Sequence, residues 1–141
     1  FSPWMLNKIN ENDKYNFRIL TFNILIPISV VIILMYVILG EDIIIFIAGS
    51  DYIASYIPLL ILLIGYIVYL LFFWTRHYLF LNDLITQHTI GRLIYLLTFI
   101  ALSFLLIDSL KFNGIAISIT SGMISQKLYE IYVYFKTKTT Q

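Results

Sequence analysis

The chain has 141 residues, of which 60% are hydrophobic and 12% charged, and its formal net charge is +1. Soluble domains carry about 25% charged residues, so this composition excludes a soluble globule with a polar surface. The small net charge argues against a nucleic-acid-binding surface, and a sequence without cysteine excludes disulfides, thiolate catalysis and cysteine-ligated zinc.

Four long apolar segments predict an all-α, polytopic membrane protein, because about 20 helical residues cross a hydrocarbon core about 30 Å thick. The expected transmembrane spans cover about residues 17–39, 52–80, 90–107 and 113–135. They leave short connections and no room for a soluble domain, so residues 1–141 are interpreted as a single membrane domain. The chain begins at Phe1 without a signal-peptide pattern, and we expect it to be a fragment of a longer protein.

The first third of the chain contains one span and two flanking segments. Phe1–Arg18 mixes apolar and charged residues, as a short amphipathic helix at the cytoplasmic interface or a polar loop would. Within the first span, Pro27 is expected to kink the helix. The amide of Asn23 is expected to face another helix or a wet cavity, because hydrocarbon offers it no partner. The apolar residues 43–48 are too few to cross a bilayer and predict an outer interfacial segment.

The second and third spans meet at a cytoplasmic loop with a turn expected near Thr86–Thr89. Aromatic residues surround Arg76, as in an aromatic belt with a snorkelling cation. The titratable residues expected to gather at this loop are Arg76, Asp83, His88 and Arg92. They form either an ordinary basic loop or a contact for an anionic headgroup or pyrophosphate. Asn23, Arg76 and Arg92 are therefore our candidate substrate-path residues.

The fourth span carries small residues at helical spacing, namely Gly114, Ser118, Ser121, Gly122 and Ser125. Such a stripe lets another helix approach closely, and this packing role is favoured over the lining of a hydrophilic cavity. Lys127 and Glu130 stand three residues apart on the same helix, where they can neutralise each other. A structural role for this pair is favoured over a functional intramembrane one.

No grouping of residues in the sequence predicts catalysis. There is no Ser/His/Asp set, no glycine-rich phosphate loop and no pair of catalytic carboxylates. His77 and His88 share no metal-binding spacing with a carboxylate. We therefore expect a protein that is not an enzyme, with no catalytic residue, metal or cofactor.

The basic residues occupy alternate gaps between the apolar segments. The second and fourth charged zones together hold a single basic residue, Lys111. The other eight basic residues lie in the first, third and fifth charged zones: Lys8, Lys14, Arg18, Arg76, Arg92, Lys127, Lys136 and Lys138. Positively charged residues accumulate on the cytoplasmic side of membrane proteins. The pattern predicts that both ends of the chain are cytoplasmic.

Three segments resemble polysaccharide flippases of the Wzx type, which belong to the superfamily of multidrug/oligosaccharidyl-lipid/polysaccharide exporters. Phe46–Tyr52 is similar to the family's short apolar stretch, Gly, two residues and Tyr before a long helix. Lys111–Ala116 resembles a Gly-x-Ala signature before a late span, although Asp108–Phe112 has neither the Pro nor the earlier Gly often found there. Ser2–Lys14 resembles a segment before another late helix.

The resemblance implies a bundle of about twelve helices in the bacterial inner membrane, with this chain as the last four spans. The implied activity is translocation of undecaprenyl-pyrophosphate-linked oligosaccharides for cell-surface polysaccharides. The implied partners are membrane lipids, the lipid-linked substrate and the preceding helices of the full-length protein, with no nucleic acid. Alternatives are another exporter of the superfamily, for multidrug export or lipid II, and a small four-helix scaffold subunit. The sequence does not identify the sugar, the coupling ion or the oligomeric state.

Overall fold

The computed structural model describes residues 11–140, and their side chains from Arg18 onward. This part of the chain is all-α. Its elements are α2 (Glu11–Ala48), the 3₁₀ helix η1 (Ser50–Ser55), α3 (Tyr56–Leu71), α4 (Phe73–Leu81), α5 (Ile85–Leu110) and α6 (Phe112–Thr139). Most of the N-terminal segment expected to be an amphipathic helix or a loop, and most of the stretch Ser2–Lys14, lie outside the described residues.

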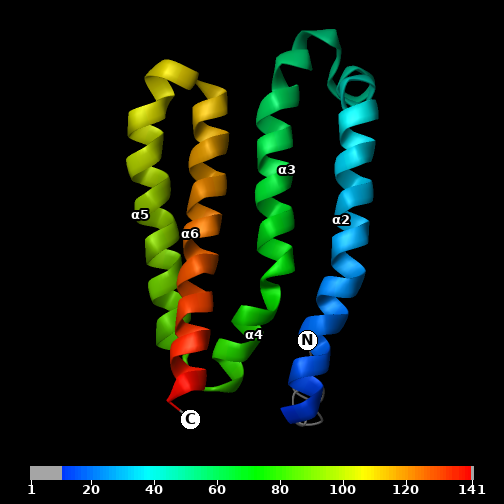
Figure 1. Cartoon of the computed structure of the whole chain (residues 1–141). Helices are drawn as coiled ribbons and strands as arrows, with labels where there is room; N and C mark the ends of the chain where they lie inside the picture. The colour runs from blue at the N-terminus through cyan, green and yellow to red at the C-terminus, as the bar shows by residue number, and fades with distance from the viewer. Residues whose placement is uncertain (1–10, 141) are drawn as a thin grey trace.

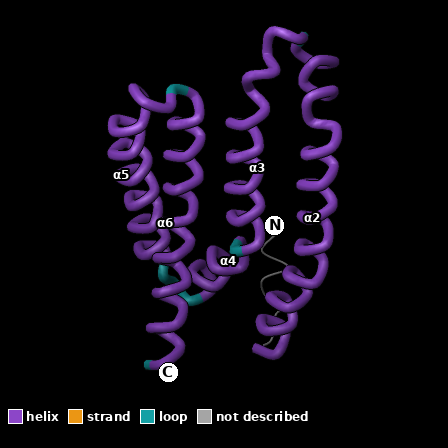
Figure 2. Tube along the Cα trace, turned by 45° about the horizontal axis from the view of Figure 1, so that its top comes forward, coloured by secondary structure: helices purple, strands orange, loops and turns teal. Residues whose placement is uncertain are grey.

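The helices form two antiparallel hairpins that stand side by side (Figures 1 and 2). α2 and α3 form one hairpin, and α5 and α6 form the other. α6 packs along both α5 and α3, whereas α2 packs mainly against α3 and η1. Both ends of the described chain lie at one end of the molecule, and the connections α2–α3 and α5–α6 lie at the other (Figure 1).

Three segments are long and apolar enough to cross a membrane: Arg18–Ala48, Ser50–Leu81 and Ile85–Leu110. The chain is therefore an all-α protein with three candidate transmembrane segments. α6 is also a long helix, but its polar residues make it less hydrophobic than these three candidate segments, and it is not among them. The fourth span over residues 113–135 stays a prediction.

α2 is longer than the apolar run that predicted it. It has 38 residues, passes through Pro27 and continues to Ala48, which corresponds to about 57 Å at 1.5 Å per residue. Residues 43–48, expected to be a separate segment, are its last turns. The helix ends at Gly49, whose φ of 101° is accessible to a residue without a Cβ atom. The position of residues 43–48 relative to a membrane stays a prediction.

The predicted second span is divided into three helical pieces. α3 ends at Leu71, and Phe72 separates it from α4, which turns away from the axis of α3 toward the lower ends of α5 and α6 (Figure 1). The chain then reverses at residues 82–84, with Asp83 at φ 56°. This reversal lies before the expected turn near Thr86–Thr89, because both of these residues already belong to α5.

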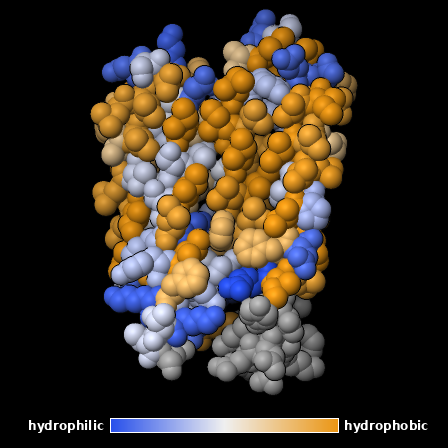
Figure 3. All heavy atoms as spheres, viewed as in Figure 1, coloured by the Kyte–Doolittle hydropathy of each residue, from blue (hydrophilic) through white to orange (hydrophobic). Residues whose placement is uncertain are grey.

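Apolar side chains cover the outside of the helices. Phe46 is 90% exposed, and Phe104 and Phe112 are each 78% exposed. Figure 3 shows a wide apolar belt between hydrophilic groups at the two ends of the molecule. Such a surface is unfavourable in water and favourable in hydrocarbon, so the exterior agrees with the candidate transmembrane segments.

Candidate functional site

A buried polar cluster joins α4, α5 and α6 near the end of the molecule that carries the termini. Its centre is Glu130 of α6, whose side chain is 0% exposed. Four other side chains reach its carboxylate, namely Thr75, His88, Gln126 and Lys127. We call these five residues the Glu130 cluster.

The two carboxylate oxygens of Glu130 have separate sets of partners. Oε2 accepts from Lys127 Nζ at 2.7 Å and from the Thr75 hydroxyl at 2.6 Å. Oε1 accepts from Gln126 Nε2 at 3.0 Å and lies 3.0 Å from His88 Nδ1. With its proton on Nδ1, His88 is a fourth donor. The carboxylate is thus saturated, as a buried charge must be to remain in a fold.

Lys127 brings the compensating positive charge to the cluster. Its side chain is buried, and Nζ lies 4.5 Å from the centre of the Tyr69 ring of α3. The ammonium therefore contacts both a carboxylate and an aromatic face, which attracts a desolvated cation. Through Tyr69 the cluster also reaches α3, so one ion pair links four helices.

Local sequence places these side chains on facing helix surfaces. On α6, Gln126 and Lys127 precede Glu130 by four and three residues. Residues three or four apart share a helix face, so both side chains lie next to the Glu130 side chain. On α5, His88 shares a face with Gly91. A Cβ atom at Gly91 would lie 3.4 Å from Gln126 and 3.6 Å from Glu130. These are ordinary van der Waals distances, so α5 and α6 are in contact at Gly91, one turn from His88.

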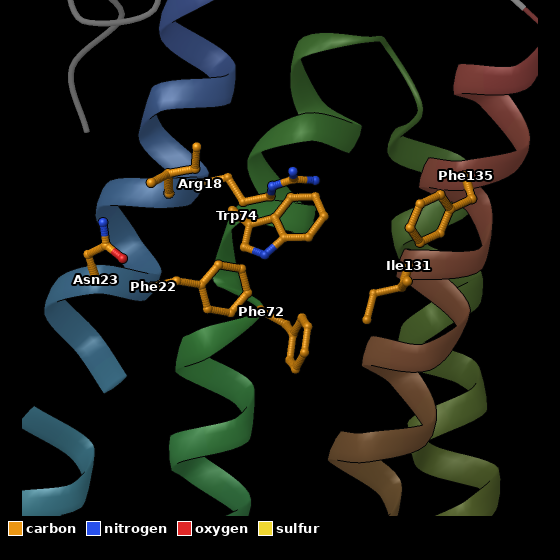
Figure 4. Close-up of a pocket in the computed structure, with 8 residues that line it drawn as sticks. Arg18, Phe22, Asn23, Phe72, Trp74, Ile131 and Phe135 are labelled. Atoms are coloured by element: carbon orange, nitrogen blue, oxygen red, sulfur yellow. The ribbon is translucent and has the colours of Figure 1, made fainter. Parts of the chain in front are cut away.

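A second feature is a groove between α2, α4 and α6, with a volume of about 390 Å³. Its lining is mainly apolar and consists of Arg18, Ile19, Phe22, Asn23, Phe72, Trp74, Ile131 and Phe135 (Figure 4). Of these lining residues, Arg18 has a charged side chain and Asn23 has a side-chain amide. The groove therefore combines an apolar wall with a cation at its edge.

Arg18 and Trp74 meet at the edge of the groove. The Arg18 guanidinium lies 5.5 Å from the centre of the Trp74 ring, and its Nη1 is 3.5 Å from the Tyr134 hydroxyl. Trp74 is 8% exposed, and its indole nitrogen is buried without a hydrogen-bond partner among the described residues. In Figure 4 this nitrogen is on the side of the ring toward Phe22 and Phe72, away from the guanidinium.

The three predicted substrate-path residues lie in different places. Asn23 is on α2 and lines the groove. Arg76, on α4, lies over the rings of Phe73 and Phe80 at 5.9 and 5.5 Å. Arg92, on α5, is exposed. The structure does not gather them into one site, and their roles stay predictions.

The residues expected to gather at the loop differ in burial. Asp83 and Arg92 are exposed, whereas His88 is buried and contacts Glu130. The expected loop cluster of Arg76, Asp83, His88 and Arg92 stays a prediction. His88 instead takes part in the Glu130 cluster, because a carboxylate on α6 lies within reach of its ring.

The small-residue stripe of α6 lies against α5. A Cβ atom at Gly114 would come within 2.6 Å of the Leu106 carbonyl oxygen, and one at Gly122 within 2.8 Å of the Tyr95 ring. Ser118 is buried and donates to the carbonyl of Gly114 in its own helix, while Ser121 and Ser125 are partly exposed. The stripe thus sits at a helix–helix contact.

Sequence reasoning found the Lys127–Glu130 pair and missed its environment. The pair forms as its spacing predicted, but it is buried, and Thr75, Gln126 and His88 were not recognised as its partners. A usable signal was the position of Gln126, Lys127 and Glu130 on the same side of α6 as the small residues. Among the described side chains, from Arg18 to Thr140, there is no group of three or more His, Asp or Glu residues arranged to hold a metal ion.

Fold and site together define an all-α protein with three candidate transmembrane segments and a buried ion pair that joins its helices. Comparisons with protein-family models, with curated proteins and with solved structures find no match for this chain.

Proposed function

We propose that this chain forms four transmembrane spans of a flippase that moves undecaprenyl-pyrophosphate-linked oligosaccharides across the bacterial inner membrane. The observation that carries the proposal is the uneven packing of the helices. α4, α5 and α6 hold the Glu130 cluster, whereas α2 packs mainly against α3 and η1 and leaves apolar residues such as Leu34 and Ile38 exposed. An edge helix of this kind suits a unit that packs into a larger bundle.

The fourth span of the proposal is α6, and its surface supports this assignment. Its 28 residues correspond to about 42 Å, which is enough to cross a hydrocarbon core. Of its charged and amide side chains, Gln126, Lys127 and Glu130 are buried within the protein, whereas Lys136 and Lys138 are exposed near its C-terminal end. Its exposed large residues include Phe112, Ile124, Leu128, Tyr132 and Phe135. A helix with polar groups inward and apolar groups outward is suited to lipid.

The two turns that carry the family resemblance also support the proposal. Gly49 has a positive φ immediately before η1, and Gly114 lies against the backbone of Leu106 at the start of α6. Glycine is required at both places for steric reasons. The resemblance therefore lies at positions where the fold restricts the residue type.

The mechanism we infer is alternating access, in which one group of helices rocks against another around a cavity near the midplane. The Glu130 cluster would keep α4, α5 and α6 together as one moving body. Asn23, Arg76 and Arg92 remain the candidates for contact with the substrate. Four spans do not enclose such a cavity, so the chain alone would not transport.

Translocation in proteoliposomes tests this function. The product of the complete reading frame and the 141-residue chain would be reconstituted separately, with a fluorescent undecaprenyl-pyrophosphate oligosaccharide whose exposure is followed by an impermeant lectin. We expect translocation with the complete product and none with the chain alone. Transport by the chain alone, or its absence from a complete product shown to be folded, would contradict the proposal.

The alternatives give different results in the same preparations. An exporter for drugs or for lipid II would move those compounds and leave the oligosaccharide in place. A scaffold subunit would move none of them. The saturated Glu130 cluster is the observation that favours a scaffold, because it holds the packed helices together. The transport assay distinguishes the scaffold from a transporter, because only a transporter moves one of the compounds.

A further inference from the structure

The packing of the Glu130 cluster favours a carboxylate that carries no proton. Lys127 Nζ and the Thr75 hydroxyl donate to Oε2, and Gln126 Nε2 and the His88 ring are directed at Oε1. Hydrogen bonds to the charged form of an acid stabilise that form. A proton added to either oxygen would meet atoms that already donate to it, so the packed arrangement disfavours proton binding.

The charges around Glu130 act in the same direction. The charged and titratable groups that surround the ion pair are Lys127 of α6, His88 and Arg92 of α5, Arg76 of α4 and Tyr69 of α3. Lysine and arginine are cations, and a nearby cation stabilises a carboxylate. Glu130 therefore binds a proton more tightly when these elements move away from it than when they are packed.

We propose that Glu130 is a proton-binding site and that the binding of one proton releases α4 from α6. The proton adds to a carboxylate oxygen, Lys127 keeps its ammonium charge, and the Thr75 hydroxyl loses a charged acceptor. A ligand that binds one of two states more tightly shifts the population toward that state. The packed form is therefore fully favoured at neutral pH and is lost as the pH falls. The inference is independent of the flippase proposal, because it concerns only the packing of these helices.

The helix that leaves is α4, because it is short and separately attached. It has nine residues, with non-helical residues on both sides. Its contacts with α6 include the buried hydrogen bond from Thr75 to Glu130 and the Trp74 ring, whose centre lies 4.9 Å from that of Tyr134. A break in the hydrogen bond leaves an aromatic contact without its buried polar partner.

Acrylamide quenching of Trp74 measures the release. The chain has two tryptophans, so Trp4→Phe leaves Trp74 as the reporter in phosphatidylcholine vesicles. Trp74 is 8% exposed in the packed form. We expect its quenching to rise in one step as the pH falls below about 5, where an unpaired glutamate takes up a proton. Absence of the step would overturn the proposal.

Two carboxylate variants assign the step. Glu130→Gln should remove it, because the amide does not titrate. Glu41→Gln, which changes an exposed carboxylate at the other end of the molecule, should keep it. A step that persists in Glu130→Gln, or disappears in Glu41→Gln, would overturn the proposal.

Substitutions of the partners separate Glu130 from His88 and decide the case in which Glu130→Gln does not fold. His88→Asn removes the titrating ring and should keep a step, whatever its midpoint. Thr75→Val removes a hydrogen bond to a charged acceptor, which changes the release equilibrium about tenfold, so the step should move about one pH unit upward. Thr75→Ser keeps the hydroxyl and should show a smaller shift. Loss of the step in His88→Asn, or an unmoved step in Thr75→Val, would overturn the proposal.

Circular dichroism in the same vesicles distinguishes the release of α4 from acid unfolding. Helix content should stay constant across the step, because backbone hydrogen bonds within the helices do not depend on Glu130. A loss of helix content at the same pH would mean that the whole bundle unfolds, which would also overturn the proposal.

Discussion

Glu130 shows how a long helix with apolar residues on its outer face can contain a carboxylate without exposing it. Its two oxygens are shared among side chains from α4, α5 and α6. Removal of one charge from a buried pair leaves the other uncompensated, which is more costly than removal of both. The cluster therefore makes the relative placement of three helices depend on a few polar atoms.

We predict that Lys127→Met destabilises the protein by about 3–5 kcal/mol, because the buried carboxylate of Glu130 loses its counter-charge. Glu130→Gln should destabilise it by a similar amount, because the ammonium is then unpaired. The double variant should lose less than the sum of the two, since neither charge is left alone. Unfolding in mild detergent, titrated with a denaturing detergent, measures these differences.

Lys136→Met is the matched control for this cycle. Lys136 is on the same helix but is exposed, and surface substitutions change stability by about 0.5 kcal/mol or less. Additive losses in the double variant would mean that Lys127 and Glu130 do not interact. A loss at Lys136 as large as at Lys127 would mean that burial does not determine the effect.

Among the elements, α5 and α6 form the closest helix pair, and glycine makes their approach possible. Gly114 lies where the hairpin begins, one turn after Lys111, whose φ is 50°. The Leu106 carbonyl opposite Gly114 belongs to helix backbone and cannot rotate away as a side chain could. The spacing between the two helices is thus fixed by atoms with little freedom to move.

We predict that Gly114→Ala destabilises the protein by about 1–3 kcal/mol, because its Cβ atom would stand 2.6 Å from the Leu106 carbonyl oxygen. Ser121→Ala, on the same helix at a partly exposed position, should change stability by less than about 0.5 kcal/mol. The same detergent titration applies. An unchanged Gly114→Ala variant would mean that the two helices can move apart at no cost.

The elements were predictable from the sequence to the extent that hydropathy determines them. Apolar runs predicted the positions of the long helices, but the end of α2 was missed, because the first span was expected to end at about residue 39 and residues 43–48 to form a separate segment. Glu41 and Asp42 interrupt the apolar sequence between the two, but both side chains are exposed and the helix continues past them to Ala48. The break at Phe72 was not predicted either, since no proline or glycine marks it.

The site was less predictable, because its contacts join distant residues. Thr75 and Glu130 are 55 positions apart, and His88 and Glu130 are 42 apart. Spacing along one helix revealed Lys127 with Glu130, but only the packing of α5 on α6 places His88 beside them. The groove likewise depends on α2, α4 and α6 together, so no local pattern indicated that Arg18 and Trp74 meet.

At the scale of the whole molecule, the open question is on which side of the membrane each connection lies. Both ends of the described chain lie at one end of the molecule (Figure 1). Acidic residues Glu41, Asp42, Asp51 and Asp108 belong to the opposite end, near the two hairpin connections. Among the described side chains, six basic residues belong to the first end: Arg18, Arg76, Arg92, Lys127, Lys136 and Lys138. The positive-inside rule therefore predicts that this end is cytoplasmic.

Single cysteines test this orientation and the fourth span together. The natural sequence has no cysteine, so a cysteine at Ser50, Ser109 or Thr139, all of them exposed positions, is the only thiol that an impermeant maleimide can label. We expect Ser50→Cys and Ser109→Cys to react in intact spheroplasts and Thr139→Cys to react only after permeabilisation. Ser109 and Thr139 flank α6, so labelling of both from one side would mean that α6 does not cross the membrane. Opposite results for Ser50 and Ser109 would mean that α3 and α5 do not form two successive crossings, and the charge pattern would then need another explanation.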